Sequence, residues 1–203
     1  MNITMKIHLV IFAFMIMSLM SCSSFSLVNS EVYDHDALAS HKTFHIVDLK
    51  MGTLPPQVDS ETYECIVEAI RTQMLERGYR ESANSPLLIN FAITVHNDTV
   101  LTPPGSKETD GPHYSGTYPC YIYPQEYYWA SHYLDAGVID GIYEDGVLTI
   151  DVVNIKKKEP LFTSSVASIV DIDGNYRNDS EIDKAVILLF SNYPVAPMPQ
   201  YRD

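Results

Sequence analysis

Cysteine, glycine, tryptophan and basic residues are all scarce in this chain of 203 residues. It has 3 Cys, 9 Gly and 1 Trp, and its 13 Lys and Arg face 26 Asp and Glu, which gives a net charge of −13. The chain has no Cys-x-x-Cys pair, no Gly-x-Ser-x-Gly elbow and no glycine-rich phosphate loop. These absences remove the usual signatures of an enzyme, and the negative charge disfavours nucleic acid and anionic lipid headgroups as partners.

The chain also lacks an apolar run long enough to cross a bilayer, which takes about 20 residues. Its longest apolar stretch, Ile7 to Met17, follows Lys6 and precedes the small residues around Ser21. This order is typical of a secretory signal over residues 1–21. Leu19-Met20-Ser21-Cys22 resembles the bacterial lipobox, in which the cysteine is lipidated and becomes the new N-terminus. The alternative is an ordinary cysteine after a plain secretory signal.

Lipidation of Cys22 predicts a lipid-anchored protein of the cell envelope. The serines at 23 and 24 resemble an outer-membrane sorting signal, and palmitate is among the fatty chains expected on Cys22. Residues 22–41 are then expected to be a polar tether and N-terminal segment. The chain beyond it is long enough for one domain, over residues 42–194, with residues 195–203 as a tail.

Residue patterns within this domain predict four strands and two helices. Alternating apolar and β-branched residues mark strands at 42–49, 87–96, 147–155 and 161–172. In the second strand Asn90, Thr94 and His96 share the face opposite the apolar residues, so this strand is expected to be half-buried. One helix runs from Asp59 or Ser60 to Gly78, and the capping pair Asn178 and Glu181 opens the other. The order predicts an α+β fold with a mostly antiparallel sheet and two helices on one face.

A long insert interrupts this pattern at residues 97–145. Its first half is rich in proline and glycine, and its second half is rich in aromatic residues, which is not the composition of a disordered segment. Two interpretations are open: a lid that packs its aromatic side chains on the sheet, or an exposed binding platform. The binding surface of the second interpretation would consist of Tyr121, Tyr123, Tyr127, Tyr128 and Trp129.

Cys65 and Cys120 are the other two cysteines. Export to an oxidising compartment permits a disulfide between them, and the helical pattern places Cys65 opposite the apolar stripe, where a free thiol would be exposed. The alternative is two unpaired cysteines. Sequence leaves both open.

Several of these segments together are similar to one protein family. They include Lys42-Thr43-Phe44, Glu76-Arg77-Gly78-Tyr79, Leu87-Leu88-Ile89, Gly146 to Asp151, the tyrosine-rich insert and Tyr193-Pro194. They resemble the bacterial lipoproteins of domain of unknown function 4136, over about Glu31 to Pro194. Ser85-Pro86 and Phe162-Thr163-Ser164 depart from the usual family pattern. The resemblance implies an α/β lipoprotein fold and an envelope location, and it implies no reaction and no catalytic residues.

Other candidate sites are weak. His41 and His45 lie four apart at the entry to a strand, a spacing too long for one metal, and Asp171 to Asn175 fits a turn better than a calcium loop. Lys156 to Lys158 fit a hairpin turn. We therefore expect no catalytic residue, no metal and no cofactor.

The function expected from these observations is non-enzymatic binding of another envelope component, through the aromatic insert or a sheet edge. One alternative is an envelope hydrolase that uses His96 or His132 near the insert. Another is an accessory subunit of lipid or polymer transport, by analogy with small α/β lipoproteins.

Overall fold

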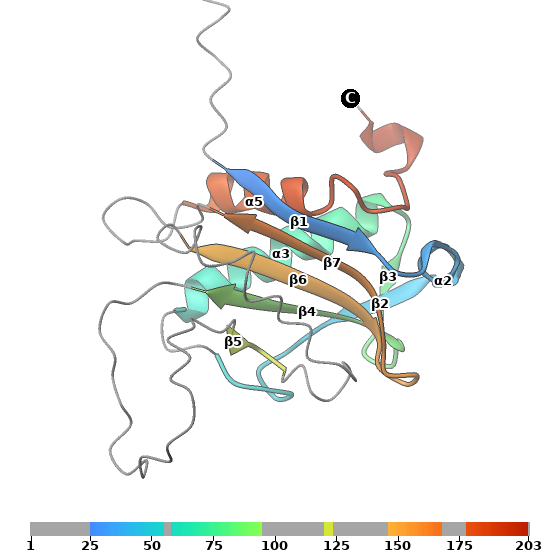
Figure 1. Cartoon of the computed structure of the whole chain (residues 1–203), viewed down its shortest axis with the longest axis horizontal. Coiled ribbons are helices and arrows are strands. Elements are labelled where there is room, and N and C mark those ends of the chain that lie inside the picture. The colour runs from blue at the N-terminus through green and yellow to red at the C-terminus, as the bar shows by residue number, and fades with distance from the viewer. Residues whose placement is uncertain (1–24, 55–57, 95–119, 124–145, 168–177, 203) are drawn as a thin grey trace, which may run out of the picture.

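A seven-stranded sheet forms the centre of the computed structural model, which describes residues 25–54, 58–94, 120–123, 146–167 and 178–202 (Figure 1). The strand order is β1-β7-β6-β4-β2-β3, and β5 pairs with β4 beside this path. The strands are β1 (Ser26–Val32), β2 (Thr43–Ile46), β3 (Arg80–Glu81), β4 (Leu87–Thr94), β5 (Cys120–Tyr121), β6 (Val147–Asn154) and β7 (Glu159–Ala167).

The sheet is mixed, so the expectation of a mostly antiparallel sheet is wrong. β2 runs parallel to both β4 and β3, whereas β1, β7, β6, β4 and β5 pair in antiparallel fashion. The helix α3 (Ser60–Glu76) connects β2 to β3 and carries the chain back to the starting end of the sheet, which is what parallel neighbours require. The alternation of apolar and polar residues in β4 predicts which side chains share a face, but it does not predict whether the neighbouring strand β2 runs parallel or antiparallel.

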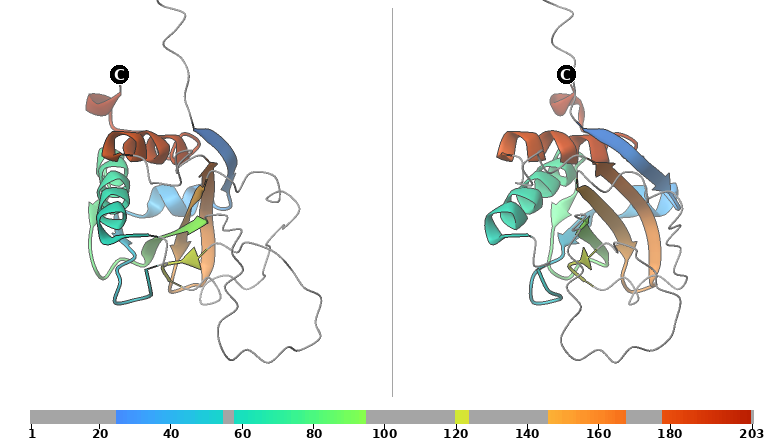
Figure 2. Two further views of the ribbon diagram at one scale, coloured as in Figure 1. Left: turned by 90° about the vertical axis from the view of Figure 1, so that its left-hand side faces the viewer. Right: turned by 60° about the vertical axis from the view of Figure 1, so that its left-hand side comes forward.

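The helices α3 and α5 (Asp179–Leu189) cover one face of this sheet (Figure 2). Both follow the predicted boundaries. Asp59 caps α3 by accepting a hydrogen bond from the Thr62 N–H at 2.7 Å, and Gly78 ends it at φ +84°. At α5, Asn178 Oδ1 accepts from the Glu181 N–H at 3.2 Å, and Asn178 Nδ2 donates to the Glu181 carboxylate at 3.2 Å, so the predicted capping pair is confirmed. The helix α2 (His35–Ser40) is short, and no helix of the described residues is long and apolar enough to span a membrane.

β4 and β6 are buried on both faces, which corrects the expectation of a half-buried second strand. Leu88, Asn90 and Ala92 lie on the face opposite Ile89 and Phe91, yet all five side chains are fully buried. Part of the cover comes from residues 120–123, because Ile122 is only 1% exposed and packs into the core. Asn90 is satisfied there: its Nδ2 donates to the Tyr123 carbonyl at 2.8 Å and its Oδ1 accepts from the Tyr123 N–H at 3.1 Å.

The N-terminal segment is part of the domain and not a tether. Phe25 is 9% exposed, and β1 begins at the next residue and pairs with β7 along its length. α2 then buries Leu38, whose carbonyl accepts a hydrogen bond from the Tyr79 hydroxyl at 2.9 Å. Residues 26–40 of the expected tether and N-terminal segment thus form β1 and α2, and residues 22–24 lie outside the described residues.

The predicted tail also packs on the domain. The Met198 N–H donates to the Glu76 carbonyl at 2.8 Å, and a short 3₁₀ helix, η3 (Pro199–Tyr201), follows. The predicted hairpin turn at Lys156 to Lys158 is confirmed between β6 and β7. The predicted strand from Leu161 is described only as far as Ala167, and Asp171 to Asn175 lie outside the described residues.

The cap at Asp59 yields a pH-dependent prediction. Hydrogen bonds from the Thr62 backbone and side chain lower the pKa of Asp59. Because the native state then binds fewer protons than the unfolded state, the stability from the cap is present above pH 4 and is lost as pH falls through the lowered pKa. Asp59→Ala should reduce the free energy of unfolding by about 1 kcal/mol at pH 7, measured by urea denaturation. Asp59→Asn is the matched control, because asparagine caps helices without titrating and should keep most of the stability. If the wild type and Asp59→Ala were equally stable at pH 7, Asp59 would not be a stabilising cap.

Candidate functional site

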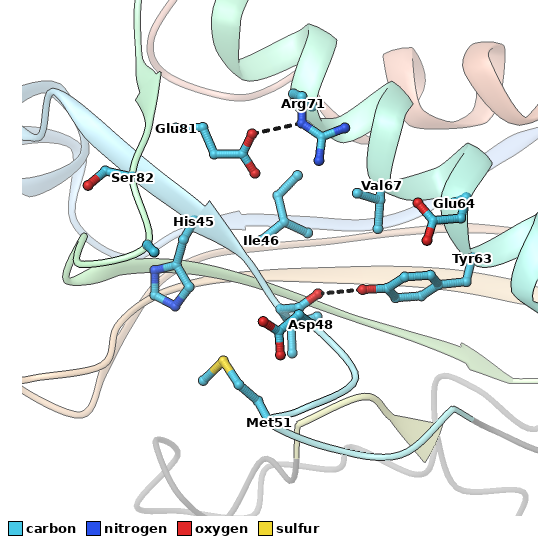
Figure 3. Close-up of a pocket in the computed structure, with 12 residues that line it drawn as sticks. His45, Ile46, Asp48, Met51, Tyr63, Glu64, Val67, Arg71, Glu81 and Ser82 are labelled. Atoms are coloured by element: carbon cyan, nitrogen blue, oxygen red, sulfur yellow. Dashed lines mark hydrogen bonds and ion pairs between the residues drawn. The ribbon is translucent and has the colours of Figure 1, made fainter.

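A groove of about 610 Å³ lies between β2 and α3 (Figure 3). Glu81 and Ser82 lie at one end of it and Tyr63 and Glu64 at the other. Its full lining is His45, Ile46, Val47, Asp48, Met51, Tyr63, Glu64, Val67, Arg71, Glu81, Ser82 and Ala83. This volume is within the range of about 300–1,000 Å³ that ligand sites usually have.

One side of the groove is a strand edge. The Arg80 N–H donates to the Lys42 carbonyl at 3.0 Å and the Ser82 N–H donates to the Phe44 carbonyl at 2.8 Å, and β3 ends there. On the other side of β2, the Val47 N–H donates to the Ile89 carbonyl at 2.8 Å. Main-chain groups alternate between the two sides of a strand, so those of Ile46 face the groove. No backbone hydrogen bond among the described residues continues the β3 ladder to Ile46.

The charge of the groove is mainly negative. Arg71 Nε donates to the Glu81 carboxylate at 2.8 Å, and Arg71 also pairs with Glu68. The hydrogen bond to Glu81 is the main reason that the pKa of Arg71 is raised. No basic side chain of the described residues forms an ion pair with the other two carboxylates, Asp48 and Glu64. The only guanidinium is thus already shared by two acids, and the groove favours a cationic ligand.

His45 contributes a neutral imidazole. Burial lowers the pKa of His45, and hydrogen bonds with the Ser85 and Leu87 backbone, together with the nearby Asp48 and Glu81, offset this only in part. Its Nδ1 is buried without a hydrogen-bond partner among the described residues. Because its folded pKa lies below the ordinary value of about 6.5, His45 is uncharged at neutral pH and does not oppose a cation in the groove.

Tyr63 forms a rigid wall. Its hydroxyl donates to the Val47 carbonyl at 2.9 Å, and its ring stacks on Phe91 with the centroids 5.7 Å apart. Burial raises the pKa of Tyr63, so the hydroxyl stays protonated at neutral pH. The described residues hold no group of three or more His, Cys, Asp or Glu placed to bind a metal. The arrangement suits binding of an extended, positively charged chain.

A second polar feature lies on the sheet face away from the helices. Asn90, Asp151, Thr163 and Glu31 are directly opposite one another across β4, β6, β7 and β1. Asp151 is 0% exposed and accepts a hydrogen bond from Thr163 Oγ1 at 2.7 Å. Burial and a 2.8 Å hydrogen bond to Glu31 raise the pKa of Tyr33, with a smaller effect from Asp151. Asn90, Asp151 and Thr163 are buried and Glu31 is exposed at the end of the row. Buried polar residues in such a row specify strand register, and we assign them to the framework.

The family model described as domain of unknown function, DUF4136, matches residues 29–195. The chain belongs to this family. No curated protein matches the chain.

Two solved structures are similar to this DUF4136 chain. A DUF4136 family protein from Bacteroides thetaiotaomicron shows 15% identity and a TM-score of 0.46, with 84% of this chain and 96% of that chain covered. A PDZ domain protein from Parabacteroides distasonis shows 18% identity and a TM-score of 0.43. That match covers 86% of this chain and 36% of the other, so this chain spans about a third of that protein's length.

Two of the segments that resemble DUF4136, Glu76-Arg77-Gly78-Tyr79 and Tyr193-Pro194, pack against each other. The Tyr193 hydroxyl donates to the Tyr79 hydroxyl at 3.2 Å, and the Arg77 guanidinium lies over the Phe190 ring, 5.2 Å from its centroid. Gly78 supplies the positive φ between them. These two motifs therefore join the end of α3 to the end of α5.

The predicted aromatic surface is described only in part. Tyr121 lies in β5, where its backbone pairs with Ala92, and Tyr123 is half-buried with its backbone bound to Asn90. Tyr127, Tyr128 and Trp129 lie outside the described residues, as do Cys22, His96 and His132. Within residues 120–123, Ile122 is buried and Tyr123 is half-buried, and the lid and the binding platform both stay predictions.

Cys65 is a free, half-buried thiol in this structure, and it faces α5 instead of solvent. Its Sγ donates to the Asp179 carboxylate at 3.2 Å, because α5 packs along the side of α3 that the apolar stripe leaves uncovered. Burial and this hydrogen bond raise the pKa of Cys65 to about 11, so the thiol is protonated and unreactive at neutral pH. The side chain of its proposed disulfide partner Cys120 lies outside the described residues.

The groove residues were missed from the sequence. Arg71 and Glu81 lie on different elements, and only the turn at Gly78 brings them together. Asp48 follows a strand, and Glu64 lies in the first turns of a helix, where an acidic residue is ordinary. The sequence offered one indication of the groove: Asp48 lies at the end of a predicted strand that a helix follows.

The substitution Gly52→Ala tests whether residues 120–123 are held in place by close contact with the loop at Gly52. A Cβ on Gly52 would lie 1.4 Å from the Ile122 carbonyl oxygen, which accepts a 3.0 Å hydrogen bond from the Thr53 N–H. Gly52→Ala must therefore displace this segment, at a cost of about 1–3 kcal/mol. We expect faster hydrogen exchange of the Ile122 amide, which donates to the Phe91 carbonyl at 3.1 Å. Leu49→Ala, in the same loop and exposed, is the control; unchanged exchange in Gly52→Ala would refute the close contact.

Proposed function

We propose that this DUF4136 protein is an envelope lipoprotein that is anchored through Cys22 and binds another envelope component without catalysing a reaction. The observation that carries the binding role is the groove between β2 and α3, where a strand edge meets carboxylates that no basic side chain of the described residues neutralises. The sequence around Cys22 supports the anchor. The acidic composition supports a partner other than nucleic acid or anionic lipid.

The start of the fold bears on how such an anchor would work. Only Ser23 and Ser24 separate Cys22 from Phe25, which is already buried. Three residue steps span at most about 11 Å, so β1 would be held close to the bilayer surface. The acidic domain would then have a defined orientation on the membrane and little freedom to leave it.

Cys22→Ser tests the anchor. The variant should incorporate no radiolabelled palmitate and should move from the detergent phase to the aqueous phase of a detergent split, because the acyl chains supply its membrane affinity. Cys65→Ser is the matched control and should behave as the wild type. Partition of the wild-type protein into the aqueous phase would overturn the lipoprotein proposal.

Site-specific crosslinking in intact cells tests the binding role. A photoreactive residue at Ala83, which lines the groove, should give a defined crosslinked product with an envelope protein. The same residue at Lys156, in the exposed β6–β7 turn, is the control and should give none. If products form only from a probe at Tyr123, the aromatic insert is the binding surface and the groove is not.

A further inference from the structure

We propose that the partner, within the binding role proposed above, is an extended polypeptide segment with basic side chains that adds as a strand to the free edge of β2. The segment would occupy the groove between β2 and α3 and continue the line of β3. This mode is β-strand addition, in which main-chain hydrogen bonds supply affinity and side-chain pockets supply specificity.

The backbone of β2 supplies the first argument. β3 is only two residues long and covers β2 at Thr43 and Phe44. Beyond that point the main-chain groups of Ile46 face the groove, and no backbone hydrogen bond of the described residues reaches them from that side. An unpaired strand edge is a template for pairing with another chain. Each hydrogen bond made there replaces one to water and contributes modestly, so the affinity depends on the groove as well.

The shape of the groove supplies the second argument. β2 ends at Ile46, and the Asp48 carbonyl already accepts a hydrogen bond from the Met51 N–H at 3.0 Å, so strand pairing in the groove would centre on the main-chain groups of Ile46. Val67 of α3 and Ile46 of β2 lie between the two ends of the groove and offer apolar surface to one face of the added strand. The wall at Tyr63 is fixed by its hydrogen bond to Val47, so the groove is formed before the ligand arrives.

The charges supply the third argument and the chemistry of the partner. Asp48 and Glu64 flank the Tyr63 end of the groove, and Glu81 stands at the other end (Figure 3). Arg71 is paired with Glu81 and Glu68 and leaves Asp48 and Glu64 for an incoming cation. A segment with lysine or arginine at alternate positions would present its charges to these carboxylates. An acidic segment would be repelled.

The opposite edge of the sheet is a poorer candidate. β1 carries a register irregularity between Leu27 and Asn29, and a bulge of this kind discourages regular pairing along an edge. Glu31 adds a charge on that strand. In the β2 groove the charges favour pairing with a basic segment.

The experiment uses the processed protein in detergent and a fluorescein-labelled hexapeptide of alternating lysine and valine. Fluorescence anisotropy should show saturable binding, and hydrogen exchange of the Ile46 amide should slow when the peptide is bound. The same peptide with alternate backbone amides N-methylated should bind at least tenfold more weakly, because it cannot complete the ladder. A hexapeptide of alternating glutamate and valine should not bind.

Variants locate the site. Asp48→Asn combined with Glu64→Gln should weaken lysine–valine binding about fivefold and reduce its salt dependence. Glu159→Gln, an exposed acidic residue at the far β6–β7 hairpin, is the matched control and should bind as the wild type.

Four outcomes would overturn the inference: no binding, equal binding of the N-methylated peptide, unchanged Ile46 exchange, or equal competition by spermidine, which would indicate a small cationic ligand. If the peptide fails while crosslinks from Ala83 persist, strand addition is wrong and the proposed binding role stands. If the crosslinks fail as well, both are wrong.

Discussion

Parallel pairing between β2 and β4 is the constraint on which the rest of the structure depends. The two strands pair only at His45–Leu88 and Ile46–Ile89, after which β2 leaves the sheet. The edge of β4 that β2 vacates is taken by β5, whose residues pair with Ala92 and Ile93. One edge of β4 is thus shared by β2 and β5, which lie far apart in the sequence. The short pairing of β2 leaves its outer edge open, and the α3 crossover places a helix beside that edge.

Buried polar groups fix this arrangement more specifically than apolar contacts can. Asn90 is fully buried in the middle of β4 and binds both main-chain groups of Tyr123, so residues 120–123 have one position on the sheet. Tyr63 fixes the position of the chain just after β2, because its hydroxyl donates a hydrogen bond to the Val47 carbonyl. An unsatisfied Asn90 in the core would cost about 1–3 kcal/mol, which penalises any shifted register. The groove is consequently a product of the same hydrogen bonds that hold the core together.

Local signals predicted the local structure. Asp59 and Gly78 define α3, and Asn178 with Glu181 opens α5, because caps act within a few residues and are readable from sequence. Strand direction was not readable, since the same alternation in Leu87–Thr94 fits either a parallel or an antiparallel neighbour. β1 was missed because Ser26, Asn29 and Ser30 have a polar, linker-like composition, and their strand conformation comes from pairing with β7. The groove could not be predicted for the same reason: Glu81 and Asp48 line one groove only because the α3 crossover returns the chain beside β2.

The positions of the two sheet edges connect the anchor with the groove. β1, next to Cys22, and β2 are separated by β7, β6 and β4, which amounts to four inter-strand steps or about 19 Å. If the proposed anchor held the domain by β1 with the sheet standing on that edge, the β2 edge would lie beyond the Debye length of about 8 Å. At that distance the field of anionic headgroups is largely screened, and the carboxylates of the groove determine which chains approach. Under the proposed function, an acidic groove at the far edge would select basic segments of envelope proteins without competition from an anchoring membrane.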